Sequence, residues 1–187
     1  PGAVILLRNF FNNRIESRDD IAKITTKPLV GHVFHSDEKD PLVVLKKHNS
    51  PITETYRAIR TRLQFYDKQN SGTQTLLFTS AFPGEGKSFT AVNMASAYAL
   101  YGKKTILIGL DLRKPVVHKL FNVKNKTGIS TYLIDQSELD DVIQNTKHPN
   151  LDFITSGPIP PNPAELMENE KTAEMFEILR QRYDYII

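Results

Sequence analysis

The stretch at 81–88, Ala-Phe-Pro-Gly-Glu-Gly-Lys-Ser, constrains the fold of this chain more than any other part of it. It follows an apolar run at 75–79 and opens a segment of small and apolar residues that extends to Tyr101 and ends at Gly102. The run has the length and continuity of a strand covered on both faces, and the segment after it is helical in pattern. A glycine-rich turn between a strand and a helix is typical of loops that wrap their amide groups around a phosphate.

This loop matches the P-loop pattern at every position except the first, where Ala81 stands in place of a glycine. Gly84 and Gly86 permit backbone angles that turn successive N–H groups toward an anion, and the next helix adds the positive end of its dipole. Lys87 is expected to reach the β- and γ-phosphates, and Ser88 to bind Mg²⁺ through its hydroxyl. The residues predicted to bind the nucleotide are Pro83, Gly84, Glu85, Gly86, Lys87, Ser88 and Phe89.

Neither a chance match nor a dinucleotide-binding motif accounts for this loop as well. A glycine-rich turn followed by Lys-Ser can occur by chance, but the strand and the helix that flank it argue against chance. The glycine motif of dinucleotide-binding folds needs a third glycine at the position where this chain has Phe89. A nucleoside triphosphate with Mg²⁺ is therefore the expected ligand.

A carboxylate follows the next predicted strand, at 105–108. The order strand, loop, helix, strand predicts a right-handed parallel crossover, so Asp111 should emerge at the carboxyl edge of the sheet, where ligands of open α/β sheets gather. Its carboxylate is expected to hold the magnesium ion or its water shell, and Arg113 to contact phosphate. Without the P-loop beside them, these two residues would more simply form an exposed salt bridge in a turn.

The remaining pattern extends the same architecture. A third strand is predicted at 151–154, a helical stretch at 163–182 and a fourth strand at 185–187. The fold class is thus predicted to be α/β, with a P-loop NTPase-like, mostly parallel sheet flanked by helices.

Ahead of the first strand, Ser50 can cap a helix that has Pro51 in its first turn. Apolar residues recur along it at helical spacing, at Ile52, Tyr56, Ile59 and Leu63. Residues 1–48 read differently, because turn signals dominate them and only one short helix is predicted, at 17–24. They are interpreted as an N-terminal extension.

Composition excludes several classes of function. A net charge of +3 over 187 residues gives no dominant basic surface, so no nucleic-acid partner is expected. Cysteine does not occur in the sequence, which excludes disulfides, thiolate nucleophiles and cysteine-ligated zinc.

Four segments together resemble the bacterial tyrosine kinases (BY-kinases), P-loop proteins that regulate capsule and exopolysaccharide synthesis. They are the P-loop, the Walker A′-like run at 106–115, the Gly-Pro-Ile-Pro-Pro-Asn-Pro-Ala-Glu-Leu segment at 157–166, and Glu-Thr-Tyr-Arg-Ala-Ile-Arg at 54–60. The resemblance covers nearly the whole chain and implies phosphoryl transfer from ATP, with Mg²⁺, to tyrosines of a neighbouring subunit. It makes Lys87, Asp111 and Arg113 the catalytic residues, and Ser88 and Asp111 the magnesium ligands.

The resemblance also assigns a role to the helix at 54–60. Glu54, Arg57 and Arg60 fit the family's E-x-x-R-x-x-R motif, which implies self-association of kinase domains into a ring. At a spacing of three the residues form a slanting row largely off the apolar stripe, so they are expected to face outward. From the spacing alone, a ladder of salt bridges within one solvated helix is the alternative.

Membrane attachment is a further implication of the resemblance. The apolar run at 1–7 resembles the last turns of a membrane helix, and Arg8, Arg14 and Arg18 resemble its basic flank. Residues 1–48 would then be a juxtamembrane extension and 49–187 the kinase domain, at the cytoplasmic face of the bacterial inner membrane, with polysaccharide synthesis and export machinery as partner. The domain would be truncated before its Walker B strand is complete.

Gly109 departs from the family pattern, because it replaces the first aspartate of Asp-x-Asp-x-Arg. This keeps open an alternative from another class, a nucleotide-gated oligomerising scaffold with little kinase activity. A partitioning-type P-loop ATPase is a further alternative, and Phe82 argues against it because those proteins carry a lysine at that position. The family's Walker B aspartate and tyrosine-rich tail are expected beyond Ile187.

Overall fold

A computed structural model of the chain describes residues 15, 17–36, 38–66 and 72–187, which belong to two units divided between His32 and Val33. In the first unit, helix α2 (Arg18–Ile24) confirms the helix predicted there. Ser17 caps it by accepting a hydrogen bond from the backbone N–H of Asp20, and the Asp20 carboxylate accepts one from Ser17 N–H in return. Within the described residues, no helix combines the length and hydropathy needed to cross a membrane, and the run at 1–7 lies outside them.

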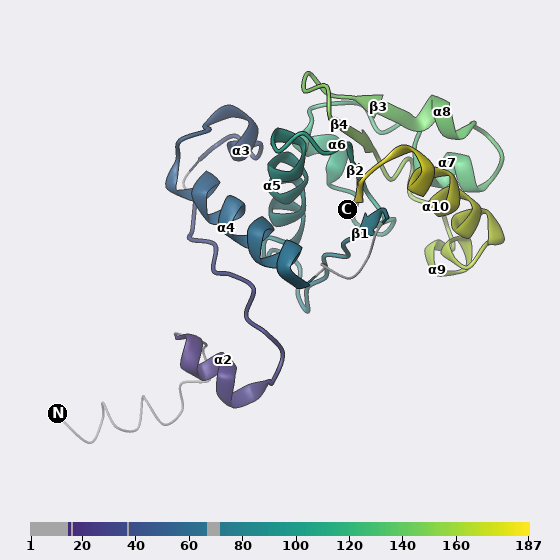
Figure 1. Ribbon diagram of the computed structural model, residues 1–187. Helices are drawn as coiled ribbons and strands as arrows, with labels where there is room; N and C mark the ends of the chain where they lie inside the picture. The colour runs from purple at the N-terminus through teal and green to yellow at the C-terminus, as the bar shows by residue number, and fades with distance from the viewer. Residues whose placement is uncertain (1–14, 16, 37, 67–71) are drawn as a thin grey trace. The chain divides into compact units, whose positions relative to one another are not determined.

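The second unit is built on one five-stranded sheet with the order β1-β5-β2-β4-β3 (Figure 1). Its strands are β1 (Gln74–Thr75), β2 (Thr105–Ile108), β3 (Ile143–Asn145), β4 (Leu151–Ile154) and β5 (Tyr185–Ile186). The pairs β1–β5, β5–β2 and β2–β4 are parallel, and only β3 runs antiparallel to its neighbour β4. The predicted mostly parallel α/β sheet is therefore confirmed, while β3 was not among the predicted strands.

Helices cover both faces of this sheet. On one face lies α5 (Lys87–Leu100), against which α4 (Pro51–Tyr66) and α3 (Val43–Lys46) pack. On the other face, α10 (Glu170–Arg182) shares one apolar core with the strands. The remaining described helices of this unit are α6 (Val117–Leu120), α7 (Ile129–Leu133), α8 (Leu139–Val142) and α9 (Pro163–Met167).

The core divides by the alternation of side chains along the strands. Ile106, Ile154 and Ile186 join the cluster that includes Met175 and Leu179 of α10. On the opposite face, the ring of Tyr98 in α5 stacks on Tyr185 of β5, with 3.8 Å between the ring centroids. Because α5 is held along its length by the sheet and by α4, its first turn has a fixed position at the carboxyl edge of the strands.

Two predicted elements differ from the structure. The run at 75–79 was expected to be covered on both faces, but β1 lies at the end of the strand order and Leu77 is 81% exposed. The stretch at 163–182 is two helices rather than one. Asn169 separates them, because its side chain accepts a hydrogen bond from Lys171 N–H and so caps α10.

The second unit begins at Val33 and so includes residues ahead of α4. Val43 and Val44 are buried. The amide of Asn93, wholly buried in α5, accepts a hydrogen bond from Val44 N–H at 3.0 Å and donates one to the carbonyl of Pro41 at 2.8 Å. The boundary predicted at residue 48 stays a prediction.

Candidate nucleotide-binding site

The P-loop connects the end of β1 to α5 through two glycines in the left-handed region. Gly84 has φ of 89° and Gly86 has φ of 86°, conformations that residues with a Cβ rarely adopt. Gly86 is the N-cap of α5, and its carbonyl accepts the N–H of Thr90 at 2.8 Å. The N–H groups of residues 87–89, which precede Thr90 in this 14-residue helix, have no acceptor within the helix. These groups and the helix dipole therefore favour an anion at this position.

Side chains of the loop are exposed, and one of them ties the loop to itself. The Glu85 carboxylate accepts a hydrogen bond from Phe82 N–H at 3.2 Å. Phe82, the residue that stands where partitioning ATPases carry a lysine, is 70% exposed. The Glu85 side chain therefore stabilises the start of the loop, while its backbone N–H remains one of the groups predicted to bind phosphate.

Lys87 and Asp111 meet at the carboxyl edge of the sheet. Lys87 is the first residue of α5, Asp111 follows β2, and Lys87 Nζ donates to Asp111 Oδ2 at 2.8 Å. Asp111 Oδ1 accepts the backbone N–H of Lys114 at 2.9 Å. Burial acts to raise the pKa of Asp111, but these hydrogen bonds, the charge of Lys87 and the backbone N–H of Arg113 outweigh it, so the pKa lies below its ordinary value. The carboxyl is ionised at neutral pH.

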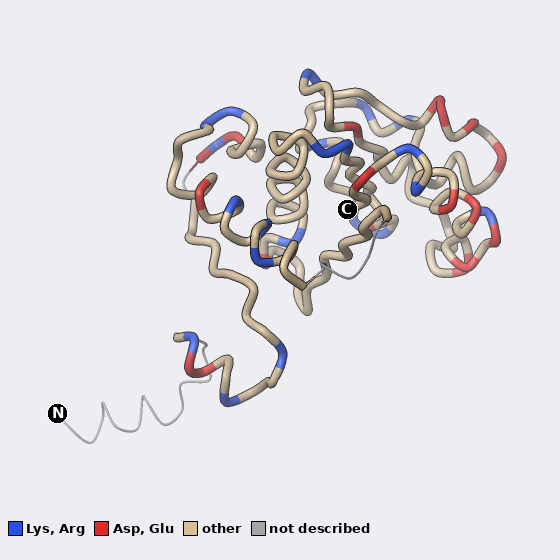
Figure 2. Tube along the Cα trace, viewed as in Figure 1, with Lys and Arg blue, Asp and Glu red and all other residues tan. Residues whose placement is uncertain are grey.

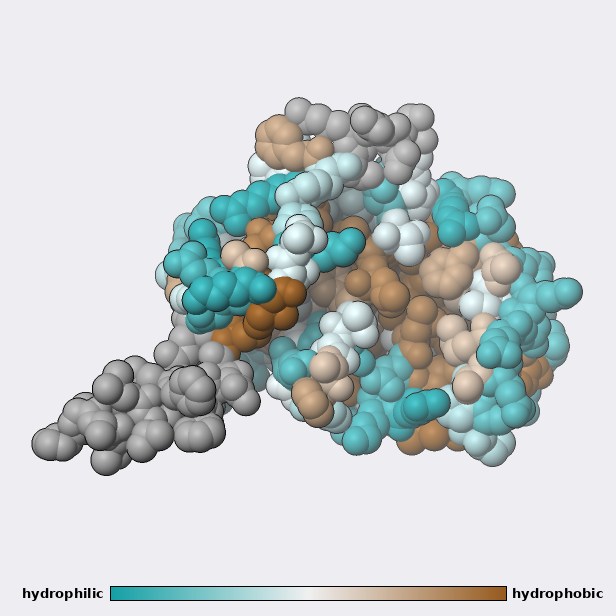
Figure 3. Space-filling view, turned by 90° about the horizontal axis from the view of Figure 1, so that it is seen from below, coloured by the Kyte–Doolittle hydropathy of each residue, from teal (hydrophilic) through white to brown (hydrophobic). Residues whose placement is uncertain are grey.

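Ser88 lines the same pocket as this ion pair. The pocket also contains Ser156, and most of its remaining lining is apolar, with residues from β1, β2 and β5. Apolar side chains gather in the middle of the face seen in Figure 3. A hydroxyl and an ionised carboxylate beside a helix N-terminus are hard oxygen donors of the kind that Mg²⁺ takes together with phosphate oxygens and water. The donor set of this site thus fits MgATP.

The structure brings some of the predicted residues together and separates others. Gly84, Glu85, Gly86 and Phe89 line a second hollow, formed with residues of the segment at 33–41. Pro83 is exposed in the P-loop. Arg113 is also exposed, and it reaches Asp111 through its backbone N–H.

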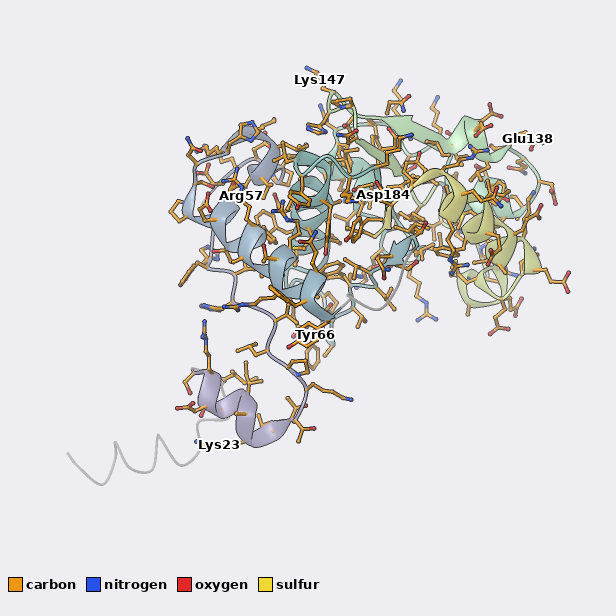
Figure 4. All side chains as sticks on the ribbon, in the orientation of Figure 1. Lys23, Arg57, Tyr66, Glu138, Lys147 and Asp184 are labelled. Carbon is orange, nitrogen blue, oxygen red and sulfur yellow. The ribbon has the colours of Figure 1, made fainter. Side chains whose placement is uncertain are left out.

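On α4, the three residues of the predicted ring motif do not share one environment. Glu54 and Arg57, the latter labelled in Figure 4, form an ion pair on the exposed side of the helix. Arg60 instead donates from Nη1 to the carbonyl of Ala97 in α5 at 2.9 Å and lies over the ring of Tyr101. The expectation that all three face outward is wrong for Arg60, because the guanidinium turns toward the end of α5.

Two residues of the site were not predicted from the sequence. Ser156 follows β4 and donates its hydroxyl to the carbonyl of Gly109 at 2.7 Å. Asn93 joins the P-loop helix to the residues ahead of α4 and also bonds Phe89 O at 2.9 Å. A serine just past a predicted strand at the ligand edge is a signal for the first; an asparagine inside a helix of small apolar residues is a signal for the second.

Comparison with known proteins decides the family. A model of the AAA domain matches residues 74–187. The solved structure of the BceF tyrosine kinase domain superposes with a TM-score of 0.81 at 32% identity, covering 92% of this chain and 74% of that one. The chain belongs to the bacterial tyrosine kinase family. The kinase domain of Escherichia coli Etk superposes with a TM-score of 0.86 at 28% identity, over 93% of this chain and 72% of that one.

Curated members of the bacterial tyrosine kinase family match the sequence as well. The tyrosine-protein kinase YwqD of Bacillus subtilis is 40% identical over 148 residues, which are 78% of this chain and 61% of YwqD. The chain thus spans less than two thirds of that relative. MinD of Pyrococcus horikoshii, solved with Mg-ADP, shares the fold at 21% identity and a TM-score of 0.51.

Charged residues of the second unit are mixed along its trace (Figure 2). Acidic residues are frequent from α8 to α10, and lysines and arginines are spread over the rest of the described trace.

Proposed function

We propose that this protein is an ATP-dependent protein-tyrosine kinase that phosphorylates tyrosines of neighbouring copies. The observation that carries the proposal is the meeting of Lys87 and Asp111, 2.8 Å apart, beside Ser88 at the N-terminus of the P-loop helix. This pairing of a P-loop cation with a carboxylate from the next strand occurs in a chain whose relatives are named tyrosine-protein kinases.

In the proposed reaction, a tyrosine oxygen attacks the γ-phosphorus of ATP, the bond from that phosphorus to the bridging oxygen of ADP breaks, and the phenolic proton is released. Lys87 and the N–H groups of the loop hold the phosphate oxygens and spread the charge of the transferring group. Ser88 and Asp111 would hold magnesium, which neutralises charge on the β- and γ-oxygens. Arg113 is proposed as a further contact for phosphate, through its exposed side chain.

Self-association is proposed to supply the tyrosine in trans. Glu54 and Arg57 are exposed on α4 and hold opposite charges, which suits a ring in which the same face of each copy meets a different face of the next. Arg60 would act in this assembly by holding α4 on α5, so that the contact surface and the P-loop helix move together.

Attachment to the cytoplasmic face of the inner membrane is proposed on the apolar run at 1–7 and the arginines that follow it in the sequence. Control of capsule or exopolysaccharide synthesis is proposed on the names of relatives. One is a putative tyrosine-protein kinase of the Klebsiella pneumoniae cps region. Residues 1–48 would be the juxtamembrane extension and 49–187 the kinase domain.

The activity is further proposed to need a carboxylate that follows β5. Ile187 lines the pocket that holds Lys87, Ser88 and Asp111. A parallel strand beside the P-loop strand delivers its next residues to this edge of the sheet. An acidic residue there would complete the oxygen ligands of magnesium.

The test is phosphotyrosine on the full-length protein incubated with MgATP, read by anti-phosphotyrosine blot and by mass spectrometry. Lys87→Met should abolish the signal, while Lys103→Met should leave it unchanged, because Lys103 lies at the opposite, amino edge of the sheet. Phosphotyrosine that persists in Lys87→Met would refute the proposal, as would none in the unchanged protein.

A further inference from the structure

Ser156 joins the two strands that lead to the site just past the point where their ladder ends. The last register pair of β2 and β4 is Ile108 with Ile154, and Gly109 N–H still donates to Ile154 O at 2.9 Å. The next acceptor, Gly109 O, is taken by the hydroxyl of Ser156 at 2.7 Å. A side chain thus continues the attachment of β2 to β4 by one more step.

The same hydroxyl lies 3.2 Å from the carbonyl oxygen of Asp111. Since a hydroxyl carries a single hydrogen, the bond to Gly109 is the principal one and the contact with Asp111 is secondary. Ser156 is 2% exposed, so water competes little for these carbonyls. The hydroxyl therefore holds the turn at 109–111 mainly through Gly109 O and contacts its other end at Asp111 O.

Gly109 allows this close approach. A Cβ on residue 109 would lie 3.0 Å from Ser156 Oγ and 3.1 Å from a methyl carbon of Val117. The family's first aspartate is thus replaced here by a residue whose missing side chain makes room for the serine. In its place the chain has a hydroxyl that fixes the backbone from which the remaining carboxylate, Asp111, projects.

We infer that Ser156 is a positioning residue for magnesium: it orients the Asp111 carboxylate toward the metal of a bound magnesium nucleotide. This inference rests on the proposed function, because it takes the pocket beside the P-loop to be the MgATP site. Ser156 acts through Asp111 and leaves the phosphate contacts of Lys87 and the loop unaffected. Its removal should therefore weaken the metal-dependent part of nucleotide binding and spare the part that needs no metal.

Ser130 provides a matched control, because it contacts the loop at 155–158 that contains Ser156. Its hydroxyl donates to the carbonyl of Pro158 at 2.7 Å, the same kind of bond at the same length, and the residue is 3% exposed. Ser130 bonds the segment after Gly157, while Ser156 bonds the turn that carries Asp111. A general loosening of the loop would appear in both alanine variants, and a specific effect on magnesium only in one.

The experiment measures the dissociation constant of ADP by calorimetry, with Mg²⁺ and with EDTA, in the unchanged protein, Ser156→Ala and Ser130→Ala. We expect Ser156→Ala to bind ADP in EDTA as tightly as the unchanged protein does. The increase in ADP affinity that Mg²⁺ produces should be about tenfold smaller in this variant, as is usual when a residue that orients a metal ligand is removed. Ser130→Ala should keep both values. Thermal unfolding of each variant reports whether it is folded.

An equal magnesium gain in Ser156→Ala and the unchanged protein would overturn the inference, and so would an equal loss in Ser130→Ala. A fall of the EDTA affinity in Ser156→Ala to the same degree would also overturn it, since the serine would then support the loop as a whole. If the unchanged protein binds ADP with no gain from Mg²⁺, the proposed function itself fails. These results are distinguishable because the last one appears before any substitution is made.

Discussion

The guanidinium of Arg60 binds the carbonyl oxygen of Ala97, 2.9 Å from Nη1 to O, and so joins α4 to the last turn of α5. Carbonyls of a last helical turn have no partner within the helix, and a cation there is favoured by the dipole. The group also lies 4.2 Å from the centroid of the Tyr101 ring. Burial lowers the pKa of Arg60, yet an arginine remains charged at neutral pH.

These contacts predict that Arg60→Ala lowers the free energy of unfolding by about 1–2 kcal/mol, through the lost charged hydrogen bond and packing. Arg57→Ala should lower it by less than about 0.5 kcal/mol, because its ion pair with Glu54 is exposed. Urea unfolding followed by circular dichroism measures both. Equal effects of the two substitutions would show that Arg60 does not hold the helices together.

Asp111→Asn tests the ion pair between Asp111 and Lys87 in the nucleotide site. Removing the carboxylate takes away a proposed magnesium ligand and also frees Lys87, which donates to it, for phosphate. ADP affinity in EDTA should therefore rise up to about fivefold, the scale of a partly exposed ion pair, while the gain from Mg²⁺ is lost. Calorimetry with and without Mg²⁺ decides it. A variant that keeps the full magnesium gain would remove Asp111 from the metal site.

The same residue predicts a dependence of stability on pH. The folded protein holds the pKa of the Asp111 carboxyl below 3.8, the ordinary value that applies in the unfolded chain. As the pH falls through these two pKa values, the unfolded chain binds more protons than the folded protein, so the free energy of unfolding decreases. The difference in unfolding free energy between the unchanged protein and Asp111→Asn should therefore shrink between about pH 6 and pH 3. Urea midpoints over that range measure it, and a constant difference would contradict the shift.

Much of this fold could be predicted from local pattern. Strands β2 and β4 lie at the predicted residues, since β2 is a run buried on both faces and β4 is buried apart from the half-buried Asp152. Ser17 and Gly102 begin or end helices through backbone chemistry that the sequence displays. The exposure of the run after β1 was not predictable in this way. An apolar run reports that its side chains avoid water, but its place in the order of strands decides whether they succeed.

The parts of the site that could be predicted are those in which a residue type at a given spacing has few alternative roles. The P-loop and the position of Asp111 after a strand follow from such residues. Arg60 was not predictable, because spacing along α4 cannot reveal that the end of α5 lies within reach of a long side chain. Ser156 was missed for a similar reason, since its bond to Gly109 joins residues 47 positions apart.

Asn93 illustrates a buried polar residue whose cost can be measured. Its amide makes three hydrogen bonds, to Val44 N–H, Pro41 O and Phe89 O, and it is wholly buried. Asn93→Ala should lower the unfolding free energy by about 2–4 kcal/mol, because Val44 N–H and Pro41 O lose their partner and the buried side chain leaves a cavity. Ser96→Ala is the matched control on the same helix. Its hydroxyl bonds only Val92 O within α5, and its loss should cost less than about 1 kcal/mol. Similar costs for both would contradict the proposed tie between α5 and the segment ahead of α4.

Gly109 and Ser156 should be energetically coupled, because each limits the space of the other. Gly109→Ala places a Cβ 3.0 Å from Ser156 Oγ and should displace the hydroxyl, so that unfolding free energy falls by about 1–3 kcal/mol as in other overpacked sites. In a Ser156→Ala background the same substitution should cost less, since the hydroxyl is gone, although Val117 and the backbone N of residue 156 stay close. A double-mutant cycle in urea is expected to give a coupling of at least about 0.5 kcal/mol. If the costs of the two substitutions simply add, Gly109 and Ser156 are not coupled. The close approach of Ser156 would then not depend on the absence of a side chain at residue 109.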